Sequence, residues 1–429
     1  MDDLLLDEIV ADAHARPLPP ATFRNVKLPW LPRKVDAIVG MRRVGKTWLM
    51  FQRMRELVEA GTPREDLLYL NFEDERLGEV TAAHLSKLVE AHYRRNPAGR
   101  ARPGALFFDE IQLVEGWERF VRRLVDTETV HVCVTGSSAK LLSREIATSL
   151  RGRSLTTELF PFSFVEVLAH RGIPFEPRPP ARSRSVIEHA SNEYLRRGGF
   201  PEVQTLDEPT RVRVLQDYLD VAILRDLIER YEISNPTALR RFVRQLMNSP
   251  AGLVSIHKMY GDFKSQGLTV SKDSLHAWLE HVQDAFVFFA IPIHTSSERV
   301  RQINPRKVYA VDPGLVTACA RRGSADVGQL LETAVFVELR RASSELTYAR
   351  TPSGYEVDFM TPSGLIQACA SIADPETRER EVRALREAMA ELGHGESTIV
   401  TLAEDEEIRV PEGTIRAVSM WRWAIERAT

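Results

Sequence analysis

The feature that most constrains the fold is a short apolar run that leads directly into a glycine-containing loop. Residues 35–39 read Val-Asp-Ala-Ile-Val, a pattern typical of a buried parallel strand. Residues 40–47, Gly-Met-Arg-Arg-Val-Gly-Lys-Thr, fit the pattern G-x-x-x-x-G-K-[ST], and residues 48–54 have helical periodicity. A strand, a loop and a helix in this order distinguish a phosphate-binding loop from a chance match. The sequence therefore predicts that the chain binds a nucleoside triphosphate.

Each part of this loop has a predicted role. Gly40 and Gly45 let the backbone curl so that successive N–H groups face phosphate oxygens, helped by the positive end of the following helix. Lys46 is expected to reach the β- and γ-phosphates, and the Thr47 hydroxyl is expected to ligate Mg²⁺. The predicted nucleotide-binding residues are Gly40, Met41, Arg42, Arg43, Val44, Gly45, Lys46, Thr47 and Trp48.

Two acids at the end of a later apolar strand form the predicted second half of the site. Asp109 follows the apolar residues 105–108 and is expected to hold Mg²⁺ at the carboxyl end of its strand. Glu110 is expected to orient and polarise the attacking water. Ser137 ends the next strand and has two compatible roles, contacting the γ-phosphate or the water, and capping a helix from Ala139.

A guanidinium group near the γ-phosphate would stabilise the charge of the transition state. Arg151 and Arg153 are the candidates for this role, acting within the chain or from a neighbouring subunit. The alternative for either arginine is a solvated or ion-paired surface position.

The length of 429 residues exceeds one ordinary hydrophobic core, so we expect several domains. Alternating strands and helices through residue 138 predict a parallel, three-layer α/β sheet. We expect a lead-in over residues 1–34, a nucleotide-binding α/β domain over 35–172, a helical linker and winged-helix region over 173–300, and a second α/β domain over 301–429.

Composition excludes several classes of function. The net charge of −3 provides no global attraction to nucleic acid, so any basic surface must be local. Cys133, Cys319 and Cys369 have no metal-ligand spacing and are typical of thiols in a reducing compartment. Because the sequence has no secretory signal and no membrane-length apolar run, we expect a cytoplasmic protein without a membrane partner.

The middle region contains a helix-turn-helix pattern. Ser255 is a predicted N-cap for a short helix, a Gly-containing turn follows, and a second helix is expected over residues 270–279. The apolar run 285–293 is a candidate first strand of a wing. The lysines on this region are offset by nearby acids, so DNA contact and packing between domains both remain open. These residues are Lys258, Lys264 and Lys272, and Asp262, Asp273 and Glu280.

With these motifs in view, the chain resembles the prokaryotic AAA-type ATPases that carry a C-terminal domain of unknown function 4143 (DUF4143). The resemblance covers nearly the whole length and rests on residues 40–47, 70–74, 107–112, 135–138, 150–153, 198–201 and 356–359. It implies an AAA-type P-loop ATPase core, a winged-helix segment and a terminal α/β domain similar to the PD-(D/E)xK restriction-endonuclease fold. By the same resemblance, Lys46 and Thr47 belong to Walker A, Asp109 and Glu110 to Walker B, and Ser137 to the sensor position.

The chain departs from the active nucleases of that fold. Asp358 stands at the first acidic position, but Gln367 and Cys369 occupy the places of the Glu-x-Lys pair. A Gln carbonyl is a weak Mg²⁺ ligand, and a neutral thiol cannot stabilise a phosphorane. The nuclease-like domain is therefore expected to be inactive, with Glu356 and Asp358 as structural or contact residues.

The expected function is Mg²⁺-dependent hydrolysis of ATP to ADP, coupled to conformational switching of a C-terminal region that binds DNA or a protein partner. One alternative is a scaffold that binds DNA or a protein partner, in which ATP is mainly a structural ligand. Self-association of the chain is a further expected contact. Another is a metal-dependent nuclease that takes ligands from elsewhere in the chain.

Overall fold

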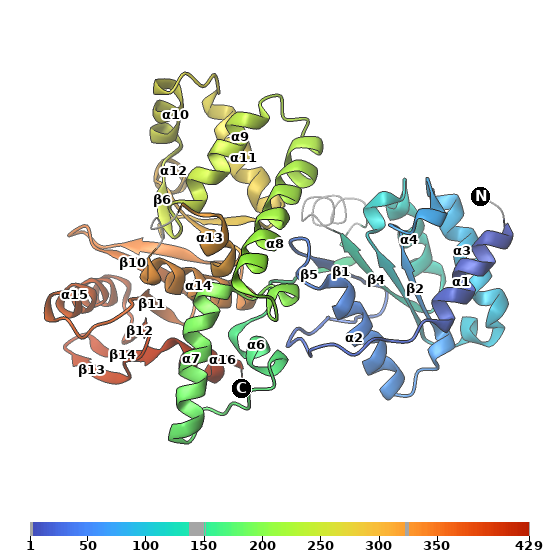
Figure 1. Ribbon diagram of the computed structural model, residues 1–429, viewed down its shortest axis with the longest axis horizontal. Helices are drawn as coiled ribbons and strands as arrows, with labels where there is room; N and C mark the ends of the chain where they lie inside the picture. The colour runs from blue at the N-terminus through green and yellow to red at the C-terminus, as the bar shows by residue number, and fades with distance from the viewer. Residues whose placement is uncertain (1–2, 137–149, 151, 322–325, 429) are drawn as a thin grey trace. The chain divides into compact units, whose positions relative to one another are not determined.

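The computed structural model describes residues 3–136, 150, 152–321 and 326–428. Two compact units make up the chain, Met1–Leu159 and Phe160–Thr429 (Figure 1). Each unit is described separately below. Among the described residues, no helix is both long and apolar enough to cross a lipid bilayer.

The first unit is built on a five-stranded sheet of order β2-β3-β4-β1-β5, in which all neighbours are parallel. Its strands are β1 (Val35–Val39), β2 (Leu67–Asn71), β3 (Gly104–Asp109), β4 (Val130–Gly136) and β5 (Ser154–Glu158). Its helices are α1 (Asp3–Ala15), α2 (Lys46–Glu59), α3 (Ala82–Arg95) and α4 (Trp117–Thr127), with short 3₁₀ turns η1 (Arg64–Asp66), η2 (Glu75–Leu77), η3 (Pro97–Ala101) and η4 (Ile111–Leu113). Every residue of β1 and β3 is buried, as expected for a parallel sheet covered on both faces. The predicted parallel α/β sheet is confirmed.

The second unit begins with helices, and the helical character expected after residue 173 is confirmed. These elements are α6 (Phe164–His170), α7 (Ala181–Arg197), η5 (Pro201–Val203), α8 (Glu208–Val221), the π-helix η6 (Ala222–Glu229) and α9 (Pro236–Met247). The end of α7 before residues 198–201 is a packing requirement. A Cβ on Gly199 would lie 2.0 Å from the Phe162 carbonyl oxygen, and Gly199 N donates to Asp312 Oδ2 at 2.6 Å.

The predicted pair of short helices lies, along the chain, between two strands of a small antiparallel sheet of order β6-β8-β7. The elements in chain order are β6 (Gly252–Val254), α10 (Ile256–Ser265), α11 (Lys272–Asp284), β7 (Phe288–Ile291), α12 (Glu298–Ile303) and β8 (Arg306–Ala310). Ser255 caps α10 as predicted, and Ser271 caps α11, each hydroxyl accepting from a backbone N–H. Strand β8 lies beyond residue 300 and completes the sheet of the middle region.

The last part of the second unit is a mixed six-stranded sheet of order β13-β14-β12-β11-β10-β9. Its elements, with the preceding helices, are α13 (Pro313–Cys319), α14 (Val327–Ala342), β9 (Thr347–Arg350), β10 (Glu356–Thr361), β11 (Gly364–Ala368), α15 (Pro375–Leu392), β12 (Glu396–Thr401), β13 (Glu406–Val410), β14 (Gly413–Ser419) and α16 (Met420–Ala428). Strands β10 and β11 form an antiparallel hairpin, and β11 runs parallel to β12.

Candidate functional site

The phosphate-loop sequence connects buried strand β1 to helix α2 through an unusual backbone. Gly40 has φ +154°, and a Cβ there would lie 2.2 Å from the Leu159 carbonyl oxygen. Arg43 has φ +67° and Gly45, the N-cap of α2, has φ +98°. Left-handed residues inside such a loop turn successive N–H groups toward one side, which favours a concave anion site. The loop therefore has its two glycines where the backbone and the packing require them.

Lys46 lies folded across this loop. Its Nζ donates to the carbonyl oxygens of Gly40 at 3.1 Å and of Met41 at 3.2 Å, and the residue is only 6% exposed. The ammonium group is thus held at the mouth of the anion site, within reach of phosphate oxygens bound there. Of the other predicted contacts, Val44 is buried, Arg42 is partly buried, and Arg43 and Trp48 are exposed.

Asp109 ends β3 and is brought to the start of α2. Its Oδ2 accepts from Thr47 Oγ1 at 2.7 Å and from the Tyr69 hydroxyl at 2.8 Å, and its Oδ1 accepts from the Thr135 hydroxyl. Asp109 is 3% exposed, so these bonds fix the carboxylate. The structure therefore joins the two predicted Mg²⁺ ligands, Thr47 and Asp109, which come from different elements.

These oxygen donors fit Mg²⁺. A hydroxyl and a carboxylate are hard ligands, and Mg²⁺ is commonly held by one or two carboxylates together with substrate phosphates. Within the described residues, no group of three or more His, Cys, Asp or Glu side chains is arranged to hold a metal ion. A metal at Thr47 and Asp109 would accordingly depend on oxygens that the nucleotide supplies.

Glu110 has a left-handed backbone, with φ +54° and ψ 44°, which is uncommon for a residue with a side chain. Its N–H donates to Thr135 Oγ1 at 3.0 Å, and Gln112 Nε2 donates to its carboxylate. Burial raises the pKa of Glu110, and the positive charge of Lys46 partly opposes this effect. Strained backbone is often kept at functional sites, so the conformation agrees with the predicted role.

Two residues of this site were missed by sequence reasoning, Tyr69 and Thr135. Thr135 had a signal, because it is a polar residue near the end of the largely apolar strand β4. Tyr69 had none, since a tyrosine within an apolar strand is typical of ordinary core packing.

The candidate arginine that the structure describes, Arg153, is not brought to the loop. It immediately precedes β5, and its Nε lies 3.0 Å from Asp126 Oδ1. Because β5 is parallel to β1 and Ser154 pairs with Val35, Arg153 lies at the edge of the sheet opposite the loop. Action of Arg153 on a phosphate bound by its own chain is therefore contradicted, and the ion-paired alternative agrees with the structure. Ser137, Arg151 and the helix expected from Ala139 lie outside the described residues.

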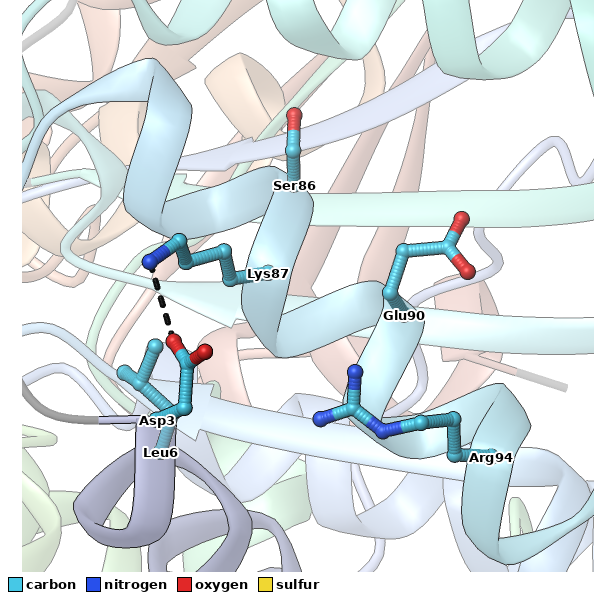
Figure 2. A pocket seen from close by; sticks show the side chains of 6 residues that line it. All are labelled: Asp3, Leu6, Ser86, Lys87, Glu90 and Arg94. Carbon is cyan, nitrogen blue, oxygen red and sulfur yellow. Dashed lines mark hydrogen bonds and ion pairs between the residues drawn. The ribbon is translucent and has the colours of Figure 1, made fainter.

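The first unit has hollows beside α2 and between α1 and α3. One, of about 340 Å³, opens beside α2 and is lined by Phe23, Arg24, Asn25, Val26, Lys27, Leu28, Leu49, Gln52, Arg53 and Glu56. The other, of about 220 Å³, is lined by Asp3, Leu6, Ser86, Lys87, Glu90 and Arg94 from α1 and α3 (Figure 2). In it Lys87 Nζ pairs with Asp3 Oδ1 at 2.9 Å. None of the residues lining this second hollow belongs to the phosphate loop, so it lies outside the candidate site.

A buried ion cluster surrounds Asp358, the residue expected at the first acidic position of the nuclease pattern. Lys307 of β8 is 3% exposed, and its Nζ lies 2.7 Å from Glu332 Oε1, 2.7 Å from Glu356 Oε1 and 2.6 Å from Asp358 Oδ1. Tyr309 OH also donates to Glu332 Oε1 at 2.7 Å. Burial alone would lower the pKa of Lys307, but the three carboxylates, Asp358 foremost, raise it above its ordinary value. Burial, then the Asp358 charge, raises the pKa of Glu332 above its ordinary value.

The two residues that depart from the nuclease pattern have other partners. Gln367 Oε1 accepts from Asp358 N at 3.1 Å, and Asp358 Oδ2 accepts from Ala368 N at 2.8 Å. Burial raises the pKa of the Cys369 thiol to about 11, so the thiol is neutral at physiological pH. Both oxygens of Asp358 are thus engaged within the chain.

Comparison with known proteins identifies an AAA domain in the first part of the chain. Residues 32–168 match the AAA domain family, and residues 188–326 match Domain of unknown function (DUF8612). The AAA part of the expected family is therefore confirmed, whereas DUF8612 takes the place of DUF4143. The chain is 33% identical over 417 residues to uncharacterized protein MJ1544 of Methanocaldococcus jannaschii, covering 94% of this chain and 90% of that protein. It is 29% identical over 327 residues to an uncharacterized protein of Haemophilus influenzae, covering 76% and 79%.

Solved structures show a weaker likeness. The Aeropyrum pernix ORC1 protein in complex with DNA is 14% identical, with 79% of this chain and 93% of that chain covered and a TM-score of 0.29. The Aeropyrum pernix ORC2 protein is 11% identical, with 80% and 94% covered and a TM-score of 0.35. At TM-scores this low, the likeness carries no inference about function.

Proposed function

We propose that this chain, which belongs to the same family as uncharacterized protein MJ1544 and has an AAA domain, binds ATP with Mg²⁺ and hydrolyses it at Gly40–Thr47. The observation that carries the proposal is the 2.7 Å hydrogen bond between Thr47 Oγ1 and Asp109 Oδ2. It places a hydroxyl from the start of α2 beside a carboxylate from the end of β3. Both atoms are suitable Mg²⁺ ligands next to a loop that is shaped to receive phosphates.

Each residue then has a role in hydrolysis. The N–H groups of the loop and the Lys46 ammonium bind the phosphates and neutralise charge as the terminal phosphoryl group leaves. Glu110 accepts a proton from the water that attacks the γ-phosphorus, and the bond to the bridging oxygen of ADP breaks. Its raised pKa supports this role, because a base is most effective when its pKa approaches the working pH. Three roles remain predictions. They are Ser137 at the γ-phosphate, Arg151 acting within the chain or from a neighbouring subunit, and Arg153 acting from a neighbouring subunit.

Replacing Lys46 with alanine is expected to weaken ATP binding about tenfold to a hundredfold, because a charge-assisted contact to phosphate contributes roughly 1.5–3 kcal/mol. The measurement is the dissociation constant of ATP in the presence of Mg²⁺. Lys87→Ala is the matched control, since this lysine is exposed on α3 and pairs with Asp3. Equal affinities of Lys46→Ala and the wild type would exclude the loop as the nucleotide site.

We further propose that the nucleotide state changes the conformation of the second unit, whose ligand is DNA or a protein partner. The element order α9, β6, α10, α11, β7, α12, β8, with sheet order β6-β8-β7, supports a winged-helix region. The segment after β7 pairs with β9, because His294 N donates to Tyr348 O at 2.6 Å and Tyr348 N donates to Pro292 O at 3.1 Å. These bonds support the alternative in which this region packs against the C-terminal sheet.

DNA remains the second candidate because three lysines are exposed on α10 and α11. If the surface that carries these lysines binds DNA, replacing Lys258, Lys264 and Lys272 together with alanine should abolish most binding at low salt. The slope of log affinity against log salt should also fall by about 0.9 for each phosphate that the variant no longer neutralises. The measurement is a salt titration of duplex binding by the wild type and the triple variant. Identical slopes would exclude this face and favour a protein partner.

We also propose that the C-terminal domain is nuclease-like but inactive. The order α14, β9, β10, β11, α15, β12, with β11 parallel to β12, supports the nuclease-like fold. The engagement of Asp358 by Lys307 and Ala368, together with the neutral thiol of Cys369, supports the absence of cleavage.

A further inference from the structure

A buried arginine outside the phosphate-loop motif contacts the loop from the lead-in. Arg24 is 2% exposed, and its Nη1 donates to the Val44 carbonyl oxygen at 2.8 Å. Val44 is the residue immediately before Gly45, and a Cβ on Gly45 would lie 3.5 Å from Arg24 Nη1. A guanidinium group is therefore packed against the peptide group that joins Val44 to Gly45.

The backbone of Arg24 is fixed by a side chain of α2. Gln52 Oε1 accepts from Arg24 N at 2.7 Å, and Gln52 Nε2 donates to Arg24 O at 3.1 Å. One amide side chain thus makes the pair of hydrogen bonds that a neighbouring antiparallel strand would make. Gln52 is 4% exposed, and its Nε2 also donates to Glu56 Oε1 at 3.0 Å, so its own orientation is set. These hydrogen bonds hold the Arg24 backbone against α2, the helix that begins at the phosphate loop.

The geometry of the peptide group explains what this contact does. A trans peptide is planar, and its C=O and N–H bonds point in opposite directions. Because Arg24 holds the Val44 carbonyl, the N–H of Gly45 must point away from Arg24. Without the guanidinium, this peptide could rotate and turn a carbonyl oxygen toward the phosphates, where it would repel them. The contact therefore selects the orientation that an anion requires.

We propose that Arg24 is a positioning residue that presets the Gly45 N–H for binding the phosphates of the nucleotide, with Gln52 as its anchor. The inference rests on the proposed function, because it assigns Arg24 to the same nucleotide site. Arg24 acts through the Val44 carbonyl and needs no contact with the nucleotide itself. Its loss should consequently weaken nucleotide binding more than it weakens the fold.

The experiment compares ADP affinity and the nucleotide-free melting temperature for Arg24→Met, Arg24→Lys and Arg64→Met. Arg64 is the matched control, because it is a partly buried arginine of the same unit whose Nη1 donates to Leu67 O and Nη2 to Ala13 O. We expect Arg24→Met to weaken ADP binding about tenfold to a hundredfold. Arg24→Lys, which keeps one donor, should fall between Arg24→Met and the wild type. Arg64→Met should leave the affinity unchanged with a similar loss of melting temperature.

The outcomes separate this inference from the proposed function. If the wild type fails to bind ADP, the proposed function fails. If the wild type binds ADP and Arg24→Met binds equally well, or if Arg64→Met weakens binding as much, only the role of Arg24 is overturned. Should Arg24→Met not fold, Arg24→Lys and Gln52→Met decide the question in the same assay. Unchanged affinity in both of these folded variants would overturn the inference.

Discussion

Replacing Glu110 with glutamine should leave ATP bound and slow its hydrolysis about 100-fold to 10,000-fold, the usual contribution of a general base. Glutamine preserves the shape of the side chain and its contact with Gln112, but it cannot accept a proton from water at neutral pH. The measurement is the single-turnover rate of phosphate release, with the dissociation constant of ATP determined on the same protein. Glu115→Gln is the control, because Glu115 is exposed a few residues further along the chain.

The pH dependence gives an independent check of the same role. Burial raises the pKa of Glu110, and only the ionised carboxylate can act as a base. The wild-type rate should therefore increase as pH rises through this elevated pKa, and Glu110→Gln should lose that dependence. Loss of ATP binding in Glu110→Gln, or an unchanged hydrolysis rate, would exclude Glu110 as the base.

Replacing Lys307 with methionine should destabilise the region around β8 and β10 by about 3–5 kcal/mol, the cost of breaking a buried ion pair from one side. Methionine fills much of the same volume but leaves Glu332, Glu356 and Asp358 without their common cation. Hydrogen exchange of peptides covering residues 306–310 and 356–361 measures this loss of stability locally. A local measurement is needed because a chain with two units need not unfold in one step.

Two further variants make this result specific to the ion cluster. Lys272→Met removes an exposed lysine of α11 and should change the exchange of these peptides little. The double variant Lys307→Met with Asp358→Asn should be less destabilised than the sum of the two single variants, because the second change removes an uncompensated charge. Strictly additive effects, or no destabilisation in Lys307→Met, would contradict the assignment of Lys307 as the cation of the cluster.

The local parts of the nucleotide site could be predicted from the sequence. Gly40, Gly45, Lys46 and Thr47 lie within eight consecutive residues, and Asp109 directly follows a recognisable apolar strand. Because the carboxyl ends of parallel strands share one edge of a sheet, the phosphate loop and Asp109 are expected to lie close together. The same geometry could have corrected the expectation for Arg153. A residue that precedes a parallel strand lies at the opposite edge, as Arg153 does before β5.

Contacts between distant segments could not be predicted in this way. Lys307 and Asp358 are 51 positions apart and belong to different sheets, so no spacing or periodicity joins them. The contact of Arg24 with Val44 depends on how an irregular lead-in packs against α2. The pairing of the segment after β7 with β9 likewise requires the tertiary fold. Such tertiary contacts decide whether the residues of a motif reach their functional positions and stay there. The sequence of the motif alone does not specify them.

The most direct test of the central claim is to measure phosphate release from ATP by the wild type and Lys46→Ala at equal protein concentration. We predict that the wild type releases phosphate only when Mg²⁺ is present and that Lys46→Ala releases little or none. Equal phosphate release by the two proteins, or release by the wild type that persists when a chelator removes Mg²⁺, would contradict the claim that Gly40–Thr47 is the catalytic centre of an ATPase.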